Sequence, residues 1–128
     1  MNQPLHRFKA ELFKALGHPL RIKILEILGA GELSVAELQR RLEVDPATTS
    51  QQLAILRSRG LVDSRRAGSA VHYRLRDPLV LDLLKVARAM SANHLVNMQE
   101  LLAAEMREEG LTARGTGGNA GRRPAAVG

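Results

Sequence analysis

A run of hydroxyl and amide side chains has the chemistry to contact nucleic-acid bases and phosphates. It comprises Thr48, Thr49, Ser50, Gln51 and Gln52. A glutamine amide can form two hydrogen bonds to adenine, and serine and threonine hydroxyls can reach phosphates or base edges. The same residue types also suit an ordinary solvated helix face in a small bundle, so their chemistry depends on the element that carries them.

A second group of side chains is cationic and follows in the chain. Six arginines and only one acidic residue lie between residues 57 and 76. We expect Arg57, Arg65, Arg66 and the turn residue Ser69 to meet DNA from this stretch, chiefly at backbone phosphates. A charged hairpin edge that resists sheet aggregation is the alternative interpretation.

Prolines and capping residues mark the helices that must position these groups. Apolar runs with helical spacing begin near Pro19, Ser34, Pro46 and Pro78. Proline is tolerated at the first helical position, and Asp45 stands directly before one of these prolines, as an N-cap should. Ser34 and Glu37 have the spacing of a capping box. A further amphipathic helix is expected over residues 4–16.

Two of these helices have the spacing of a helix-turn-helix. Residues 34–42 and 46–59 carry inward-facing apolar positions and are joined by a three-residue turn. Thr49, Leu53 and Leu56 share the inward face of the second helix. The polar run therefore stands at the N-terminal end of the second helix, where a recognition helix meets DNA.

A hairpin and a long helix complete the predicted order. Residues 71–75 alternate between apolar and polar as in a half-buried strand, and residues 61–66 are the expected partner strand. The predicted fold is mainly α with a small β-hairpin, a homodimeric winged helix-turn-helix in the order α-α-α-α-β-β-α. Residues 1–109 are expected to form the DNA-binding and dimerisation domain, and residues 110–128 a disordered tail rich in glycine and arginine.

The long helix, expected from residue 78 to about residue 109, carries an apolar stripe suited to pairing with a second copy of the chain. Such a dimer would place two recognition helices about 34 Å apart, for successive major grooves. A helix folded back on its own domain is the alternative. The predicted interface residues are Leu5, Phe8, Leu12, Val80, Leu84, Ala87, Met90, His94, Met98 and Leu101.

Composition limits the other classes of function. The chain has 128 residues, a formal net charge of +6 and 45% hydrophobic residues, which fits one globular domain with a polyanionic partner. An aromatic content of 2% gives few stacking platforms for single-stranded nucleic acid. The absence of cysteine excludes disulfides, thiolate metal sites and cysteine nucleophiles. No apolar run approaches the roughly 18 residues of a membrane span, so we expect no membrane partner and a cytoplasmic location.

Several stretches of the sequence resemble the ArsR/SmtB family of bacterial repressors. They are residues 12–25, 49–53, 56–57, 60–62 and 65–75, within a resemblance that covers roughly residues 5–107. The resemblance implies a winged-helix homodimer that binds operator DNA and releases it on binding an effector. The recognition positions of the family fall on Thr48, Ser50, Gln51 and Gln52, and members often carry histidine at the last of these positions.

The metal-binding motifs of that family are incomplete here. Members with a site in helix 3 read Glu-Leu-Cys-Val-Cys, whereas this chain reads Glu32-Leu33-Ser34-Val35-Ala36. A second family site needs several histidines on the last helix, but Asp82 lacks its following histidine and His94 is the only histidine there. We therefore expect no metal and no cofactor, and His94 is interpreted as an interface residue. A nickel or zinc site that uses His6, His18 or carboxylates is left open.

These features predict a sequence-specific transcriptional regulator of the ArsR type, a repressor that binds a palindromic operator in double-stranded DNA as a homodimer. An architectural DNA-binding protein and a metal-responsive regulator are the alternatives. An enzyme is not expected, because the sequence has no glycine-rich phosphate loop and no nucleophile elbow. The sequence does not specify how DNA binding is controlled. Binding of a small molecule, binding of a partner protein, protonation of His94 and control by protein abundance are all compatible with it.

Overall fold

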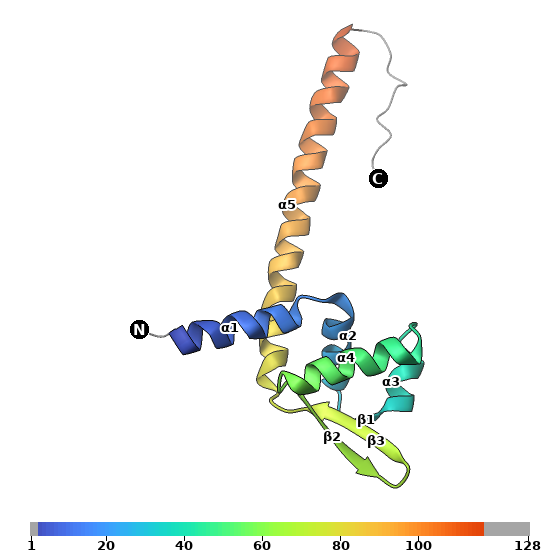
Figure 1. Ribbon diagram of the computed structural model, residues 1–128. Coiled ribbons are helices and arrows are strands. Elements are labelled where there is room, and N and C mark those ends of the chain that lie inside the picture. Colours follow the sequence, from blue (N-terminus) through green and yellow to red (C-terminus); the bar gives the residue numbers. More distant parts are fainter. Residues whose placement is uncertain (1–2, 117–128) are drawn as a thin grey trace. The chain divides into compact units, whose positions relative to one another are not determined.

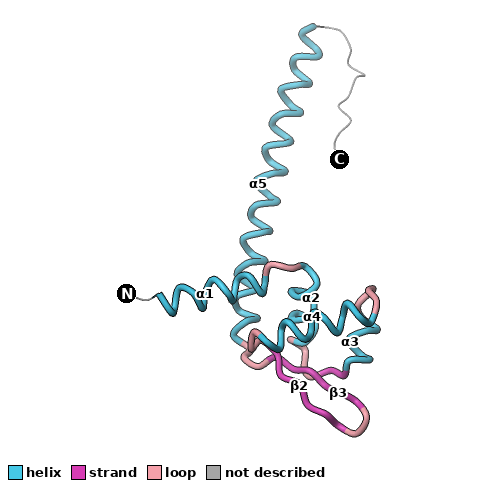
Figure 2. Tube along the Cα trace, in the orientation of Figure 1, coloured by secondary structure: helices cyan, strands magenta, loops and turns pink. Residues whose placement is uncertain are grey.

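The computed structural model describes the backbone of residues 3–116 and the side chains of residues 3–110. Every predicted helix and strand is present, together with one short additional strand (Figures 1 and 2). In chain order the elements are α1 (Gln3–Leu16), α2 (Pro19–Leu28), β1 (Leu33–Ser34), α3 (Val35–Arg41), α4 (Pro46–Ser58), β2 (Val62–Ala67), β3 (Ala70–Leu75) and α5 (Leu79–Thr116). The chain divides into two units, Met1–Val86 and Ala87–Gly128, and the described part of the second is the continuation of α5.

Local capping explains where α3 and α4 begin. The Ser34 hydroxyl accepts a hydrogen bond from the Glu37 backbone N–H at 3.1 Å, and the Glu37 carboxylate accepts one from the Ser34 backbone N–H at 2.8 Å. Asp45 Oδ2 accepts a bond from the Thr48 backbone N–H at 3.1 Å. Each bond satisfies an amide that has no intrahelical partner, so the predicted caps of both helices are confirmed.

A three-stranded antiparallel sheet follows the helix-turn-helix, with the strand order β1-β3-β2. The hairpin of β2 and β3 runs in register from Val62↔Leu75 to Ala67↔Ala70, and Gly68 in its turn has a φ of +64°, which favours glycine. The additional strand β1 pairs Leu33 with Tyr73 on the other edge of β3. Its two residues are too few to show the alternation that predicts a strand.

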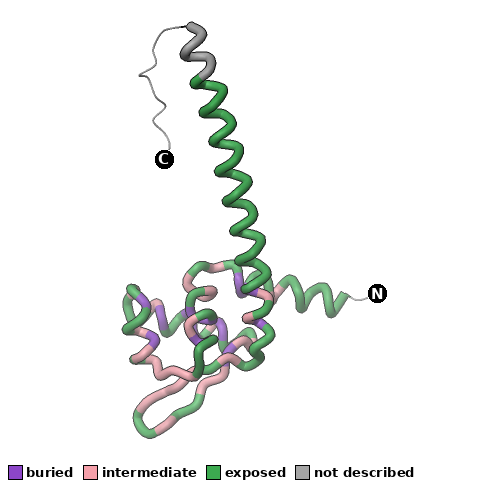
Figure 3. Tube along the Cα trace, turned by 180° about the vertical axis from the view of Figure 1, so that it is seen from behind, coloured by how far each residue is buried: buried purple, intermediate pink, exposed green. Residues whose placement is uncertain are grey.

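An aliphatic core fills the first unit (Figure 3). Its fully buried members are Ile24, Leu25, Leu38, Leu53, Leu56 and Val62. Val80 and Leu84, in the first turns of α5, join the same core with exposed fractions of 7% and 6%. The prediction that these two residues lie in a dimer interface is therefore wrong. Apolar residues four apart on a helix are equally suited to cover the core of their own protomer.

Helix α5 passes from the first unit into the second and is longer than predicted. It ends at Thr116, whereas the sequence predicts an end near residue 109. All side chains described from residue 85 to residue 110 are exposed. Residues 110–116, which the sequence prediction assigns to the tail, continue the helix, and residues 117–128 lie outside the described residues. No helix within residues 3–116 combines the length and the apolar content needed to cross a membrane.

Candidate nucleic-acid interface

The N-terminal end of α4 presents two free polar side chains to solvent. Ser50 and Gln51 are exposed, and the side chain of neither forms a hydrogen bond within residues 3–116. Thr48 is half-buried, and its hydroxyl donates to Asp45 Oδ1 at 2.7 Å. This bond and the Thr48 backbone amide lower the pKa of Asp45, so the cap stays charged. The Thr48 hydroxyl oxygen can still accept a hydrogen bond from a ligand, whereas the Gln51 amide can both donate and accept hydrogen bonds.

Two other members of the predicted polar run are turned into the protein. Thr49 is 0% exposed, and its hydroxyl donates to the Asp45 carbonyl at 3.4 Å, so the prediction that it contacts DNA is wrong. Gln52 is 8% exposed, and its amide oxygen accepts a hydrogen bond from Arg21 at 2.9 Å. Gln52 is therefore also removed from the expected contacts. The inward spacing of Thr49 with Leu53 and Leu56 already indicated its burial, whereas nothing in the spacing indicated the Arg21 bond.

A groove of about 550 Å³ lies between the helix-turn-helix and the wing. Ser50 of α4 lines it on one side, and Ser69, in the turn of the hairpin, lines it on another. Ser34 of β1 and Val35, Ala36 and Gln39 of α3 line it as well, together with Pro46, Ala70 and Val71. The structure therefore brings together two predicted contacts that are separated in the sequence.

The wing is joined to α4 by a rigid turn at Gly60. The Leu61 backbone N–H donates to the Leu56 carbonyl at 3.0 Å, and the Gly60 N–H donates to the Arg57 carbonyl at 3.0 Å. This is the hydrogen-bond pattern of a Schellman motif, which requires a left-handed residue, and Gly60 has a φ of +75°. The position of β2 relative to the recognition helix is thereby fixed.

Arg65 and Arg66 point to opposite faces of the hairpin, because successive residues of a strand alternate. Arg65 shares a face with its cross-strand partner His72 and pairs with Glu32 through two parallel bonds, at 3.0 and 2.6 Å. The hydrogen bond from Arg65 is the main cause that lowers the pKa of Glu32. Arg66 shares the other face with Val71. The two arginines, which the sequence treats alike, are therefore placed in different surroundings.

Only part of the cationic stretch is uncompensated. The ion pairs of this stretch are Arg59 with Glu11, Arg65 with Glu32 and Arg76 with Asp63. Arg57, Arg66 and Arg74 are exposed and form no ion pair among the residues that the structure describes. The sequence prediction did not include Arg74 among the DNA contacts, although Arg74 is one of the six arginines of the cationic stretch.

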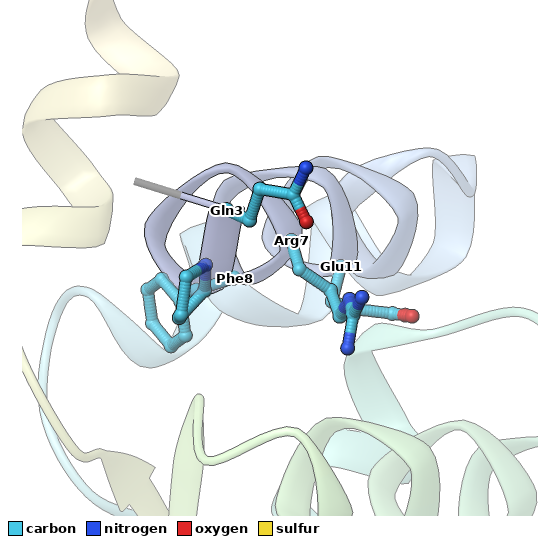
Figure 4. A pocket seen from close by; sticks show the side chains of 5 residues that line it. Gln3, Arg7, Phe8 and Glu11 are labelled. Atoms are coloured by element: carbon cyan, nitrogen blue, oxygen red, sulfur yellow. The ribbon is translucent and has the colours of Figure 1, made fainter. Parts of the chain in front are cut away.

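Apolar side chains on α1 form a second exposed surface. Leu5 and Phe8 are 47% and 64% exposed, whereas Leu12 is half-buried against the core of its own protomer. A shallow depression beside Phe8 is lined only by residues of this helix, and Figure 4 shows Gln3, Arg7, Phe8 and Glu11 around it. Because every residue that lines this depression belongs to one helix, it does not bring together polar groups from different elements as a binding site would.

Helix α5 carries more exposed apolar surface than the predicted stripe. Met90, Met98 and Leu101 of that stripe are 51–67% exposed, and Ala87 and His94 are exposed as well. The prediction omitted further exposed residues of the same helix, namely Leu79, Val86, Leu95, Val96, Leu102 and Met106. They lie outside the single stripe of positions three and four residues apart on which the prediction was based, and including the neighbouring helical positions would have identified them. Monomeric proteins rarely expose so many contiguous apolar side chains.

Metal ligands do not converge in the part of the chain that the structure describes. No group of three or more histidine, aspartate or glutamate side chains suited to a metal ion is found there. Glu32 and His72 approach each other, with Oε2 and Nδ1 3.6 Å apart, but Arg65 already occupies the carboxylate.

Known proteins share this sequence and this arrangement of elements. A family model described as a helix-turn-helix domain matches residues 16–65. The uncharacterized HTH-type transcriptional regulator Rv0081 of Mycobacterium tuberculosis is 43% identical over 95 residues, which cover 73% of this chain and 83% of the relative. The biofilm growth-associated repressor of Agrobacterium fabrum is 40% identical over 81 residues, covering 63% of this chain and 69% of the repressor.

Solved structures agree with the sequence relatives. The crystal structure of Rv0081 superposes with a TM-score of 0.67 at 42% identity, over 75% of this chain and 97% of that chain. A homodimeric winged helix-turn-helix DNA-binding domain from Mycobacterium bovis, a possible ArsR-family transcriptional regulator, gives a TM-score of 0.65 at 32% identity, over 72% and 85% of the two chains. With its helix-turn-helix, its wing and these relatives, the chain belongs to the ArsR/SmtB family of winged helix-turn-helix transcriptional regulators.

Proposed function

We propose that this regulator is a repressor that binds a palindromic operator in double-stranded DNA as a homodimer. The observation that carries the proposal is the groove in which Ser50 of α4 and Ser69 of the wing lie on different walls. Gln51, the next residue after Ser50, is exposed, and the exposed Arg57 and Arg66 follow in α4 and in β2. The groove thus brings a hydroxyl of the helix-turn-helix and a hydroxyl of the wing together, and exposed groups suited to bases and phosphates follow in the same elements.

Each group has a separate role in this proposal. Gln51 reads a base edge in the major groove, because its amide can donate and accept at once and has no partner in the protomer. Ser50 donates to a phosphate or a base at the N-terminus of α4, where the helix dipole also favours an anion. Thr48, whose hydroxyl hydrogen is donated to Asp45, accepts from the amino group of a base. Arg66 and Ser69 of the wing, with Arg57, contact the phosphate backbone and contribute mainly affinity.

The experiment that tests base reading begins with selection of bound fragments from genomic DNA. Binding of the selected site and of random DNA is then compared for wild type, Gln51→Ala and the control Ser58→Ala. Ser58 lies at the far end of the same helix, and its hydroxyl donates to the Ile55 carbonyl. We expect Gln51→Ala to lose about 1–3 kcal/mol on the selected site only. An unchanged preference in Gln51→Ala, or an equal loss in the control, would remove Gln51 from base recognition.

The homodimer is proposed from the exposed apolar surfaces of α1 and α5. Burial of such side chains is favourable at about 25 cal/mol per Å² of apolar surface, and a second copy presents the same surfaces. The described homodimer from Mycobacterium bovis supports the same assembly. The proposed interface comprises Leu5, Phe8, Ala87, Met90, His94, Met98 and Leu101, with Leu12 at its edge.

Repression follows from occupancy, because a dimer bound across promoter DNA excludes the polymerase without any further activity. The repressor of Agrobacterium fabrum supports this direction. The protein acts in the cytoplasm, where bacterial DNA lies, and catalyses no reaction. Transcription in vitro from a template that carries the selected site should fall as the protein is added, and a rise would show an activator instead.

A further inference from the structure

Arg21 of α2 joins two helices to which the proposed function gives different tasks. Its Nε donates to the Ala15 carbonyl at 2.7 Å, and its Nη2 donates to the Lys14 carbonyl at 3.4 Å; both acceptors lie in the last turn of α1. Its Nη1 donates to the Gln52 amide oxygen at 2.9 Å, in the middle of α4. One planar guanidinium thus holds the end of α1 and the recognition helix in a fixed geometry.

The acceptors on both helices suit a cation. The last carbonyls of a helix lack intrahelical partners and carry partial negative charge, so a guanidinium stabilises the end of α1. Gln52 is buried, and a buried amide oxygen requires a hydrogen-bond donor within the protein. Arg21 supplies that donor and directs the Gln52 oxygen toward α1.

A second polar link connects the same two helices. Arg59, the C-cap of α4, pairs with Glu11 of α1 at 2.8 Å. The two side chains are 42% and 45% exposed, so water screens this pair more than the half-buried contact of Arg21. Helix α1 is therefore tied to both the middle and the end of α4, and Arg21 makes the better shielded of the two links.

We infer that Arg21 is a positioning residue for DNA recognition, which acts through Gln52 by setting where α4 lies relative to α1. The inference rests on the proposed function, in which α4 reads bases and α1 lies in the dimer interface. A recognition helix that shifts loses base contacts first, because base hydrogen bonds are directional while phosphate attraction is long-ranged. Loss of Arg21 should therefore lower discrimination between DNA sites more than total affinity.

The test is a double-mutant cycle with Arg21→Met and Gln52→Met. The measured quantity is the ratio of affinity for the selected operator to affinity for random DNA. Each single variant should lower this ratio roughly tenfold, and the double variant should lower it no further, because all three lose the same contact. Gln52→Glu keeps an acceptor for Arg21 and should preserve the ratio even where its charge weakens binding to all DNA.

Two results would overturn the inference. One is an Arg21→Met protein that is folded by circular dichroism and dimeric by sedimentation, yet has the same ratio of operator affinity to random-DNA affinity as wild type. The other is additive losses in the cycle, which would show that Gln52 acts on DNA independently of Arg21. If Arg21→Met does not fold, Arg21→Lys enters the same cycle, since an ammonium cannot serve the three acceptors as a planar fork.

Hydrogen exchange on the free protein separates this inference from the proposed function. Both methionine variants should show faster amide exchange in α4 than wild type, and unchanged exchange in both would contradict the Arg21–Gln52 link. A wild-type protein that prefers no DNA site would refute the proposed function, while the exchange result would still decide whether Arg21 holds α4.

Discussion

A single charged substitution in α5, Met98→Asp, should weaken the proposed dimer without destabilising the folded protomer. Met98 lies in the second unit, where every described side chain is exposed, and contributes nothing to the core of the protomer. Met98→Asp should therefore leave the folded protomer stable to within about 0.5 kcal/mol. In a dimer that uses this face, the same substitution buries an unpaired carboxylate in each chain.

The expected magnitude follows from the exposed fraction. Full burial of a methionine side chain is worth about 1.5–3 kcal/mol, and Met98 is 51% exposed, so pairing gains roughly 1 kcal/mol per chain. The two chains together lose about 2 kcal/mol from this term, and desolvation of the new charges adds at least as much. A total near 4 kcal/mol corresponds to roughly a thousandfold weaker dimer.

Sedimentation velocity over a range of concentrations measures this change, with thermal unfolding as the check on the fold. Asn93→Asp places the same charge on the side of the helix opposite Met98 and should stay dimeric. Leu84→Ala removes a core side chain that is 6% exposed and should cost about 2–5 kcal/mol of stability. A Met98→Asp protein that dimerises like wild type and binds the operator equally well would refute the proposed interface.

Three further outcomes are expected from the wing and the titratable groups. Arg66→Ala should lower the slope of log affinity against log salt by about 0.9, whereas Arg65→Ala, whose partner is Glu32, should lower it less; equal slopes would contradict their opposite placement. The pKa of Glu32 is lowered in the folded protein, so its charged carboxylate stabilises the fold at a pH above the ordinary glutamate pKa of 4.5. The stability advantage of wild type over Glu32→Gln should therefore decrease and disappear as the pH falls below 4.5. Thermal unfolding from about pH 6 to about pH 3 measures this change. Calorimetry with nickel, zinc and cobalt should show no stoichiometric sub-micromolar binding that alters DNA affinity, in wild type or His94→Ala, and one such metal would establish a site.

Local signals in the sequence predicted most of the fold. Ser34 and Glu37 lie three residues apart, and Asp45 directly precedes a proline, so the starts of α3 and α4 could be read from neighbouring residues alone. The strand β1 could not, because its pairing with Tyr73 joins segments far apart in the chain. A two-residue strand is defined by its partner and not by its own pattern.

The candidate site was predictable by residue type but not by partner. Counting charges located the cationic stretch, but the acids that neutralise Arg59 and Arg65 are Glu11 and Glu32, which lie elsewhere in the sequence. The polar run on α4 likewise contained both exposed and buried members, and only packing distinguishes Gln51 from Gln52. Periodicity also identified an apolar stripe on α5 without showing that the protomer itself covers its beginning.

The rigid turn at Gly60 constrains how such a protein could be switched. Because that turn fixes the wing to α4, each protomer should read its half of an operator as one unit. In the proposed dimer, the distance between the two halves would then depend on how α1 and α5 pair with the second copy. An effector can shift binding only by as much as it favours one of two arrangements, and in the proposed dimer a change in that pairing is one such shift. The Glu11–Arg59 pair ties α1 directly to α4, and Arg21 of α2 links the same two helices, so a change at the proposed dimer interface would reach the recognition helix through these contacts.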